Sequence, residues 1–351
     1  MVMKQLAALA GVVALALALL EPAAAAGLKF SSNDLKSEKL LWRLYERWGK
    51  RYNVARKPAE KLRRFATFNE TAHRVASRVQ VAGQAPGLNI FADVTNEEFS
   101  RNFLCHMTTE QRNLTARPPR RGGNGTLPLP VSVNWRNKTC EGQPCLGPVK
   151  FMGSCGSCWA FAATGALESH RAIAGANYDD PVLLSEQELV DCDPRSKGCK
   201  GGLAVNAFQY VMKNGLATST SYPYTGVGNG TCHANTTTRA SLIMRGFERL
   251  PPHDKFQLLS AVTYGPVAVS IAVTTQDDIT DFMDYDGGMY RGKCGTTCNH
   301  AMLLVGYGAD YYILKNSYGR YWGDEGYLFL PRDRNCGMLN RGGSYPLMGQ
   351  A

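Results

Sequence analysis

The chain of 351 residues carries a formal net charge of +10, and 44% of its residues are hydrophobic. This length allows one large or two medium-sized domains, each with an ample core. The excess of basic residues lies in residues 27–126, where 19 Lys and Arg face 9 Asp and Glu, whereas residues 127–351 contain 19 of each. The charge therefore gives no reason to expect that the larger part of the chain binds nucleic acid.

The first segment has the pattern of a secretory signal peptide. Lys4 precedes an apolar run from residue 6 to residue 20, and a small-residue tract ends in Ala24-Ala25-Ala26. A membrane anchor is the alternative, but the apolar run is too short to span a bilayer comfortably. We expect residues 1–26 to be a signal peptide and the rest of the chain to lack stable membrane insertion.

Two amphipathic helices are predicted between about residues 33 and 80. One apolar stripe contains Leu41, Tyr45 and Trp48, and Pro58 suits the first turn of the second helix. The second stripe recurs near the helical period at Leu62, Phe65, Phe68, Ala72, Val75 and Val79. Residues 116–130 follow and are rich in Pro, Gly and Arg, which predicts an exposed linker open to proteolysis.

The remaining chain changes from helical to strand patterns. Residues 158–174 form a small-residue apolar segment suited to a buried helix, and two more helices are predicted at 184–192 and 203–213. Strands separated by Gly-rich turns are predicted at 267–273, 301–307, 311–315 and 327–330. Helices followed by strands indicate an α+β fold with two lobes.

Eleven cysteines behind a signal peptide favour an oxidising compartment and disulfide bonds. The odd number leaves at least one thiol unpaired. Acceptor sites for N-glycosylation, Asn-x-Ser/Thr, begin at Asn69, Asn113, Asn124, Asn137, Asn229 and Asn235. We expect a glycosylated protein of the secretory pathway, with the extracellular space or the lysosome or vacuole as its destination.

Cys158 is the strongest candidate for a chemically active group. The segment Gly153-Ser-Cys155-Gly-Ser-Cys158-Trp159 places this sulfur where a Gly/Ser turn enters a helix. A helix N-terminus and a neighbouring imidazolium both lower the pKa of a thiol. The Cys155-x-x-Cys158 spacing alone also fits a redox pair or half of a metal site. However, the chain has no second such pair and no strand–helix setting of a thioredoxin-like domain.

This segment resembles the signature of the papain family of cysteine peptidases. Further motifs follow in the family's order, at residues 184–193, 198–202, 222–224, 299–301, 315–317 and 322–327. The resemblance implies a papain-like fold, with a helical lobe and a β-barrel-like lobe, and a cysteine endopeptidase activity. It also implies that His300 pairs with the Cys158 thiolate and protonates the leaving amine, while Asn316 orients the His300 ring.

The N-terminal part resembles the prodomain of cathepsin L-like precursors. Glu60, Arg64 and Phe68 match the start of a spaced helical pattern, and the stretch Gly87-x-Asn89-x-Phe91-x-Asp93 is complete. The pattern is broken at Thr71, Val75 and Val79. The resemblance implies a mainly helical inhibitory prodomain with its linker at residues 27–126 and a peptidase domain at 127–351. The chain would then be a zymogen.

The resemblance also implies three disulfides, Cys155–Cys199, Cys192–Cys232 and Cys294–Cys336. Cys140 and Cys145 lie in a short insertion and can close a loop of their own, and Cys105, in the prodomain, has no assigned partner. Two interpretations of Cys298 stay open. It is either a free, partly buried thiol that lines the cleft or a redox-sensitive or metal-binding partner of Cys158 and His300.

Two residues depart from the family pattern near the nucleophile. Met152 stands where the family has the Gln that completes the oxyanion hole, and the loss of one such donor typically costs about 10²–10³ in rate. Tyr318 replaces the Trp that shields the Asn–His hydrogen bond. The alternative function is therefore a catalytically weakened papain-like protein that acts as a binding or regulatory module. Retention of Cys158, His300 and Asn316 favours the enzyme.

By resemblance, Gly201 and Gly202 offer backbone hydrogen bonds to an extended peptide. The main specificity pocket would be lined by Leu203, Ala204, Ser270, Cys298 and Ala301, with its floor near 340–342. If Arg341 points into it, the pocket accepts acidic side chains. The expected partners are protein or peptide substrates and the chain's own prodomain as inhibitor, with no nucleic acid and a monomer as the default. No cofactor and no metal are implied.

Overall fold

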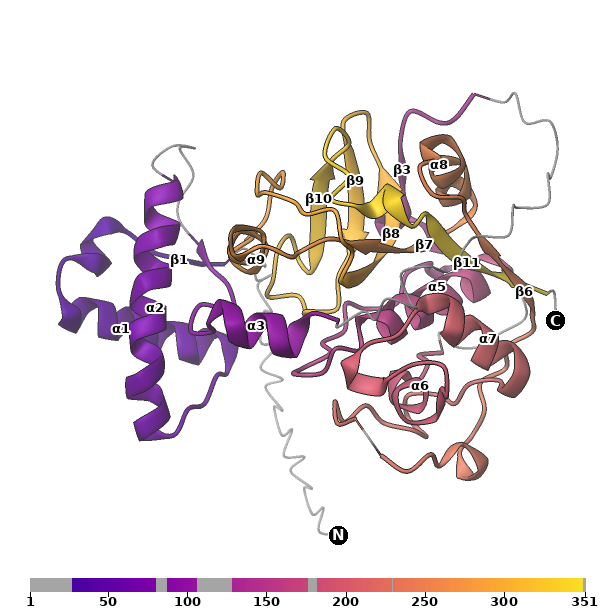
Figure 1. Ribbon diagram of the computed structural model, residues 1–351, viewed down its shortest axis with the longest axis horizontal. Helices are drawn as coiled ribbons and strands as arrows, with labels where there is room; N and C mark the ends of the chain where they lie inside the picture. Colours follow the sequence, from indigo (N-terminus) through magenta and orange to yellow (C-terminus); the bar gives the residue numbers. More distant parts are fainter. Residues whose placement is uncertain (1–26, 80–86, 106–127, 176–181, 229, 350–351) are drawn as a thin grey trace, which may run out of the picture.

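The computed structural model describes residues 27–79, 87–105, 128–175, 182–228 and 230–349. The predicted signal peptide, most of the predicted linker and the sequons at Asn113, Asn124 and Asn229 lie outside the described residues. A helical N-terminal part stands on one side of the molecule, and a larger two-lobed part stands on the other (Figure 1). Within the described residues, no helix is both long enough and apolar enough to cross a membrane.

The N-terminal part contains the two predicted helices. Its elements are β1 (Leu28–Lys29), α1 (Glu38–Tyr52), α2 (Pro58–Val79), β2 (Gly87–Leu88) and α3 (Asn96–Phe103), with a short 3-10 turn at Ser32–Leu35. The Ser37 side chain caps α1 by accepting from the Leu40 N–H, and Asn53, the residue after the end of α1, has a left-handed φ of 52°. Pro58 opens α2, as predicted.

The two helices cross and share a core of their own (Figure 1). Trp48 of α1 and Phe68 of α2 are fully buried, and their ring centroids lie 5.6 Å apart. Leu62 was expected in the buried stripe of α2, and this is wrong because the residue is 67% exposed. The buried face starts one turn later, with Phe65 packed against the core and Phe68 inside it.

The helical lobe consists of α5 (Cys158–Ile173), α6 (Glu186–Cys192) and α7 (Ala204–Asn214), near the three predicted ranges. α5 is buried over most of its length because its small residues allow close approach on several sides. A Cβ on Gly165, for example, would lie 3.1 Å from the Leu303 side chain. This helix therefore joins the two lobes and fixes its first residue, Cys158, at their boundary.

The second lobe is built on a seven-stranded antiparallel sheet with the order β10-β9-β8-β7-β11-β6, and β3 pairs with β8. The strands are β3 (Val133–Asn134), β6 (Met244–Arg249), β7 (Val267–Ile271), β8 (His300–Tyr307), β9 (Tyr311–Lys315), β10 (Tyr327–Pro331) and β11 (Gly343–Met348). Two helices, α8 (Lys255–Tyr264) and α9 (Gln276–Met283), belong to this lobe, and a small hairpin joins β4 (Thr139–Cys140) to β5 (Gln143–Pro144). The predicted strands are present.

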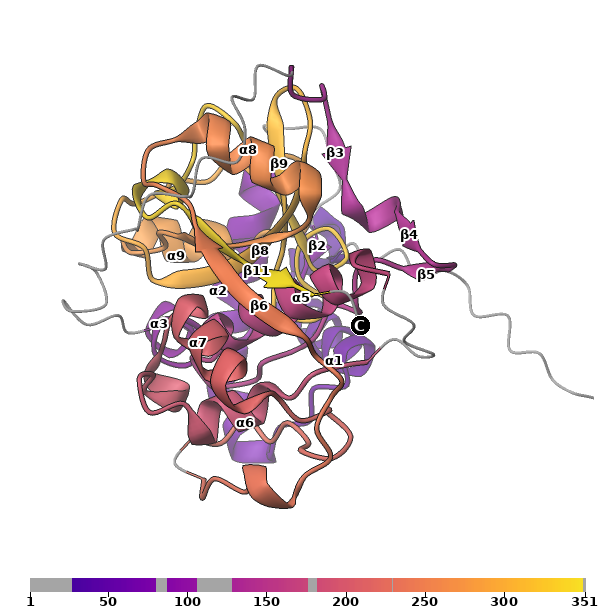
Figure 2. The ribbon, with the colours of Figure 1, turned by 90° about the vertical axis from the view of Figure 1, so that its right-hand side faces the viewer.

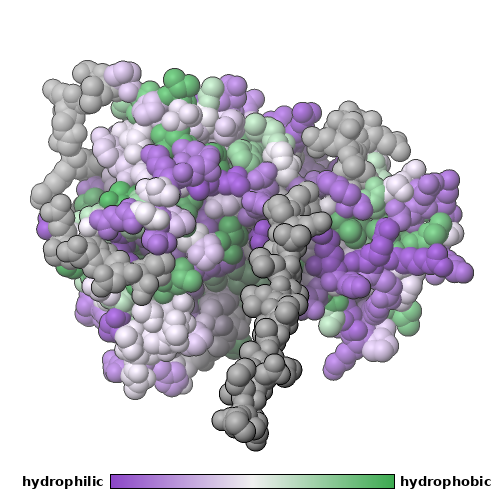
Figure 3. Space-filling view, turned by 180° about the vertical axis from the view of Figure 1, so that it is seen from behind, coloured by the Kyte–Doolittle hydropathy of each residue, from purple (hydrophilic) through white to green (hydrophobic). Residues whose placement is uncertain are grey.

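The three parts meet at one place. α3 leaves the N-terminal part and extends toward the junction of the two lobes (Figure 1). Figure 2 shows the sheet lobe above the helical lobe, with α1 and α2 behind both. This arrangement places the end of α3 where it can reach the first residue of α5. Hydrophilic residues gather on the N-terminal part, which lies on the right of Figure 3.

Candidate active site

Cys158 is held at the start of α5 by a tightly packed turn. Gly156 donates its N–H to the Cys199 carbonyl oxygen at 2.9 Å, and a Cβ at position 156 would lie only 2.6 Å from that oxygen. Ser157 precedes the helix without a side-chain cap, so the first-turn N–H groups, including that of Cys158, are not satisfied by a capping side chain. The helix therefore presents open donors and partial positive charge beside this sulfur.

His300 begins β8 and is oriented by Asn316. Its Nε2 lies 2.8 Å from Asn316 Oδ1, so Nε2 carries the proton in this contact and Nδ1 is the free base position. Asn316 Oδ1 is fixed in turn by the Ser317 N–H at 2.8 Å. The N–H of Ala301, the next residue after His300, lies 3.3 Å from Cys158 Sγ. The structure thus brings the three predicted catalytic residues together.

Burial keeps the His300 ring neutral in this form. The residue is 1% exposed, and desolvation lowers its pKa to about 4 although the bond to Asn316 opposes this shift. The Tyr318 ring covers the imidazole at a centroid distance of 4.9 Å. Its hydroxyl lies 3.4 Å from His300 Nδ1 and donates to the Phe103 carbonyl oxygen at 2.7 Å. The Tyr318 ring therefore shields the imidazole, and its hydroxyl also contacts the N-terminal part.

Met152, which stands in the sequence where the resemblance implies an oxyanion donor, packs beside Ser317. It is fully buried, and its sulfur accepts a hydrogen bond from the Ser317 hydroxyl at 3.3 Å. Its backbone is anchored as well, since its N–H donates to the Ser317 carbonyl and its own carbonyl accepts from the Tyr224 hydroxyl at 2.6 Å. The Tyr224 hydroxyl also lies 2.7 Å from the Ser157 hydroxyl, so the motif at residues 222–224 contacts the turn that precedes Cys158. A thioether donates no hydrogen bond, so the side chain at 152 supplies no donor.

The predicted substrate-binding residues come from both lobes. Gly201 and Gly202 are buried, and a Cβ on Gly202 would lie 2.5 Å from the Trp159 ring, which requires glycine there. Leu203 and Ala204 follow directly at the start of α7. Across the site, Ser270 of β7 and Ala301 of β8 are paired in register.

Cys298 is a free and buried thiol. Its sulfur lies 3.1 Å from the Gly337 carbonyl oxygen and 3.6 Å from that of Ser270. Burial raises its pKa to about 11, although the nearby charge of Arg341 acts against the shift. Among the described residues there is no group of three or more His, Cys, Asp or Glu side chains that could hold a metal ion. The free state and the burial of Cys298 agree with the first interpretation, a free thiol.

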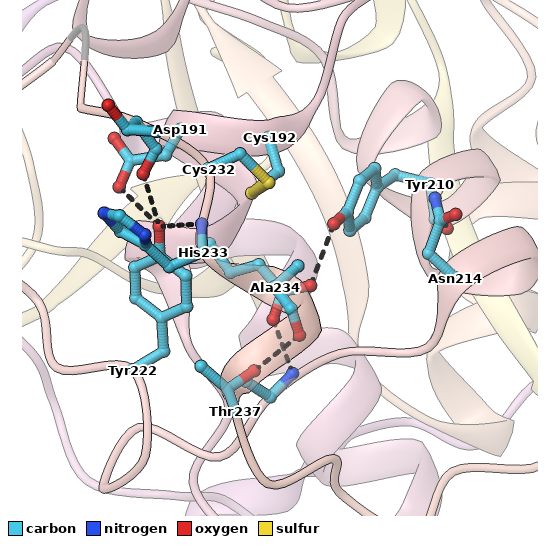
Figure 4. Close-up of a disulfide and its surroundings, with 12 residues drawn as sticks. Asp191, Cys192, Tyr210, Asn214, Tyr222, Cys232, His233, Ala234 and Thr237 are labelled. Carbon is cyan, nitrogen blue, oxygen red and sulfur yellow. Dashed lines mark hydrogen bonds between the residues drawn. A yellow bond between two sulfur atoms is a disulfide. The ribbon is translucent and has the colours of Figure 1, made fainter.

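The described residues form five disulfides, and four of them are pairs that the sequence suggested. Cys155–Cys199, Cys192–Cys232 and Cys294–Cys336 are formed as expected, and Cys140–Cys145 closes a short loop. Figure 4 shows the Tyr222 hydroxyl directed at Asp191 beside the Cys192–Cys232 bond, and their oxygen atoms lie 2.9 Å apart. The fifth disulfide joins Cys105 to Cys158 and was not predicted. Its only signal in the sequence is that Cys105 has no partner among the pairs expected from the sequence.

The N-terminal part docks through polar anchors and aromatic packing. Asn89 donates to the carbonyl oxygens of Met283 and Tyr285 at 2.7 and 3.0 Å. Phe91 packs edge-on against Tyr318. Basic residues meet the acidic residues at the end of α9 in the ion pairs Lys29–Asp286, Arg74–Asp284, Arg78–Asp281 and Arg78–Asp284. Sequence reasoning found Asn89 and Phe91, but it did not find the receiving surface.

Comparison with known proteins agrees with this arrangement. Residues 129–346 match the papain family of cysteine proteases. The cysteine endopeptidase Rep1 of Oryza sativa subsp. japonica is 37% identical over 340 residues, covering 92% of this chain and 88% of the rice protein. The proform of the ragweed pollen cysteine protease Amb a 11 is 33% identical with a TM-score of 0.77, covering 92% of this chain and 99% of that one.

The bromelain protease of Ananas comosus, in complex with the E64 inhibitor, is 33% identical with a TM-score of 0.55, and the match covers 63% of this chain and all of that one. The fold and these matches define a cysteine endopeptidase in its zymogen form. The chain belongs to the papain family of cysteine proteases. Its N-terminal part is the prodomain, packed on the protease as inhibitor as in the proform structures.

Proposed function

We propose that this zymogen hydrolyses peptide bonds in proteins or peptides with Cys158 as nucleophile, His300 as general acid and base, and Asn316 as the residue that orients His300. One arrangement carries the proposal. His300 Nε2 is fixed 2.8 Å from Asn316 Oδ1, while the backbone N–H next to His300 lies 3.3 Å from Cys158 Sγ. A nucleophile, a base and the group that orients the base are thereby joined in one site.

The mechanism follows from these positions once the prodomain has left and Cys158 is reduced. The Cys158 thiolate, stabilised by the first turn of α5 and by protonated His300, attacks the substrate carbonyl carbon. His300 then gives its Nδ1 proton to the leaving amine, and the acyl group stays on the sulfur. Water, deprotonated by His300, hydrolyses this thioester. Asn316 holds the proton on Nε2 throughout, so that Nδ1 is the atom that exchanges protons.

The oxyanion hole is the weak part of this machinery. The backbone N–H of Cys158, at the open end of α5, supplies one donor, and Met152 supplies none. The rate then falls short of that of a site with two donors by about 10²–10³-fold. A purely regulatory role would not require the hydrogen-bonded His300–Asn316 pair, and this pair is intact. The proposal is therefore a slow endopeptidase.

The specificity pocket is proposed to accept acidic side chains. Ser270, Cys298 and Ala301 would form one wall, because Ser270 pairs with Ala301 and the Cys298 sulfur lies 3.6 Å from the Ser270 carbonyl oxygen. The Arg341 charge is close enough to act on the Cys298 thiol. A guanidinium near the pocket floor would pair with a carboxylate. A peptide library should therefore show turnover of substrates with Glu or Asp in the pocket, and Arg341→Gln should lose this preference. A preference for large apolar side chains alone would refute it.

We place the prodomain and linker at residues 27–126 and the peptidase domain at 127–351. The Pro130 carbonyl oxygen accepts from the Tyr307 hydroxyl at 3.2 Å, and β3 pairs with β8, so the chain belongs to the sheet lobe from about residue 130. Disulfides on both lobes support a protein of the secretory pathway, ending outside the cell or in the lysosome or vacuole. N-terminal sequencing of the matured protein tests the boundary.

The proposed nucleophile is tested by labelling with the epoxide inhibitor E-64 together with turnover of a fluorogenic peptide. Protein that is cleaved in the linker and mildly reduced should take up one equivalent of E-64 at Cys158 and hydrolyse the peptide. Cys158→Ala should lose both. Cys298→Ala is the control for the site of labelling, because it removes the buried thiol that is free in the structure and should still take up one equivalent of E-64 at Cys158. Label on another residue would contradict the assignment.

A further inference from the structure

The predicted nucleophile is already bonded to another sulfur. Cys105 Sγ and Cys158 Sγ form a disulfide across 53 residues of sequence, with the two Cα atoms 7.0 Å apart, just beyond the roughly 4.4–6.8 Å that disulfides usually span. Cys105 lies two residues beyond the end of α3, and both cysteines are buried. The bond therefore joins the prodomain to the first residue of α5.

Backbone contacts hold Cys105 in this place independently of the sulfur atoms. Its N–H donates to the Asn299 carbonyl oxygen at 2.8 Å, one residue before His300. Two residues earlier, the Phe103 carbonyl oxygen accepts from the Tyr318 hydroxyl at 2.7 Å. The Leu104 carbonyl oxygen lies 3.1 Å from where a Cβ on Gly156 would be. The segment thus passes between the two lobes, directly over the site.

The helix that carries this segment is anchored as well. The Asn96 side chain, in the first turn of α3, donates to the Thr280 hydroxyl at 2.6 Å, which ties α3 to α9. At the other end, Phe99 and Phe103 pack edge-on against Tyr318. Because both ends of α3 contact the protease, Cys105 is directed toward Cys158 by the docked fold.

The other cysteines leave no competing arrangement. Eight of the eleven form the other four disulfides. Cys298 is buried between β7 and the Gly337 loop, where its sulfur faces two carbonyl oxygens. Pairing of Cys105 with Cys158 thus accounts for all cysteines except this one.

We propose that Cys105 and Cys158 form a thiol–disulfide exchange site that locks the zymogen covalently and is opened by a dithiol reductant. The inference rests on the proposed role of Cys158 and adds a second requirement for activity. Proteolysis cuts the backbone in the linker, but the disulfide joins Cys105, before the linker, to Cys158, after it. A chain cut anywhere between 106 and 127 therefore keeps its prodomain until the disulfide is reduced.

The exchange consumes one dithiol. A reductant thiolate attacks Cys105 Sγ, the Cys105–Cys158 bond breaks, and the bonding electron pair leaves with Cys158 Sγ. Cys158 is the better leaving group because the start of α5 stabilises its thiolate. The second thiol of the reductant then attacks the mixed disulfide and releases Cys105. The reductant ends as its disulfide, and its two protons are taken up by Cys105 and by the Cys158–His300 pair.

The bond itself is tested on the full chain purified without reductant. After denaturation, one thiol per chain should react with a maleimide, and it should map to Cys298. A non-reduced digest should contain a peptide pair linked through Cys105 and Cys158. Three reactive thiols, with Cys105 and Cys158 both labelled and no linked pair in the digest, would overturn the proposal.

The lock is tested by limited trypsin cleavage in the linker under nitrogen. The wild-type prodomain should stay with the protease on a denaturing non-reducing gel, and it should separate when dithiothreitol is added. Cys105→Ser and Cys158→Ser should separate without reductant, whereas Cys298→Ser should behave as wild type. Wild type that separates without reductant would contradict the lock.

Turnover of a fluorogenic peptide separates this inference from the proposed function. Cleaved wild type should be silent and gain activity with dithiothreitol, whereas cleaved Cys105→Ser should be active without it. A linked peptide pair in protein that stays inactive after reduction supports the bond and refutes the role of Cys158. An active enzyme in which Cys105 was never paired refutes the lock and leaves the proposed function intact.

Discussion

The guanidinium of Arg74 forms two hydrogen bonds with the carboxylate of Asp284, at 2.8 and 3.1 Å. Arg74 lies on α2 of the prodomain, and Asp284 follows α9 in the protease. The Asp284 side chain is only 5% exposed. Removal of its partner leaves a buried carboxylate whose remaining cation is the more exposed Arg78, 3.3 Å away.

Arg74→Gln should therefore weaken docking of the prodomain by about 3 kcal/mol. A loss of this size raises the undocked fraction about 100-fold. The measurement is the initial rate of peptide hydrolysis by the reduced but uncleaved chain. Arg47→Gln is the matched control, because the Arg47–Asp34 pair lies at the surface within the prodomain and should leave this rate unchanged. Equal rates for both variants would rule out the predicted role of Arg74.

Met152→Gln should raise kcat/KM of the matured enzyme by about 10²–10³-fold, because the amide supplies the missing oxyanion donor. Met152→Leu, which is apolar and of similar size, is the control and should give no gain. Each variant loses the contact between the Ser317 hydroxyl and the sulfur, so the comparison isolates the donor. If Gln were no faster than Leu, another group would already fill the oxyanion hole.

Tyr318→Phe should ease release of the prodomain. The substitution deprives the Phe103 carbonyl oxygen of its donor, which costs the docked form about 1–3 kcal/mol. The initial rate of the reduced, uncleaved chain should rise, whereas kcat of the cleaved enzyme should change little. A fall of kcat in the cleaved enzyme would show instead that the hydroxyl, 3.4 Å from His300 Nδ1, takes part in catalysis.

Two buried histidines predict that the zymogen loses stability in acid. Burial lowers the pKa of both His170 and His300 to about 4, from an ordinary value of 6.5. Between these values the unfolded chain binds protons that the folded chain does not, so the free energy of unfolding falls as the pH drops from 6.5 toward 4. Each histidine contributes about 3 kcal/mol to this fall.

Urea unfolding at pH 7, 5.5 and 4.5 measures this effect. His170→Gln should make the fall smaller, because Gln can still donate to the Pro266 carbonyl oxygen but does not titrate. The neighbouring Tyr345, which stacks on His170, stays protonated over this range, since burial raises its pKa. A fall that is the same with and without His170 would contradict the assignment.

Strands of the sheet were predictable where they are buried and therefore consist of apolar runs. β8 and β9 are apolar runs separated by Gly308, and both were found near their observed limits. β11 was not found, because Gly343 and Pro346 are poor strand formers and its pairing with β6 and β7 depends on tertiary contacts. Leu62 was expected to be buried but is exposed, since a residue with helical spacing can still lie outside the buried face.

The site was predictable where neighbouring residues carry the chemistry. Cys158, His300 and Asn316 stand in recognisable local motifs, and the structure brings them together. The Cys105–Cys158 bond has no local motif, because its halves lie in two separately folded parts of the chain. Cys105 and Cys158 meet only because α3 docks on the protease, and no short sequence motif indicates the surfaces that dock.

Cys158 is proposed as the nucleophile of a slow endopeptidase, masked by Cys105. The most direct test is the site and stoichiometry of E-64 labelling in linker-cleaved protein, determined by peptide mapping before and after mild reduction. We predict no label before reduction and one equivalent at Cys158 afterwards, together with turnover. Label at Cys158 before reduction would contradict the mask, and label elsewhere after reduction would contradict the nucleophile.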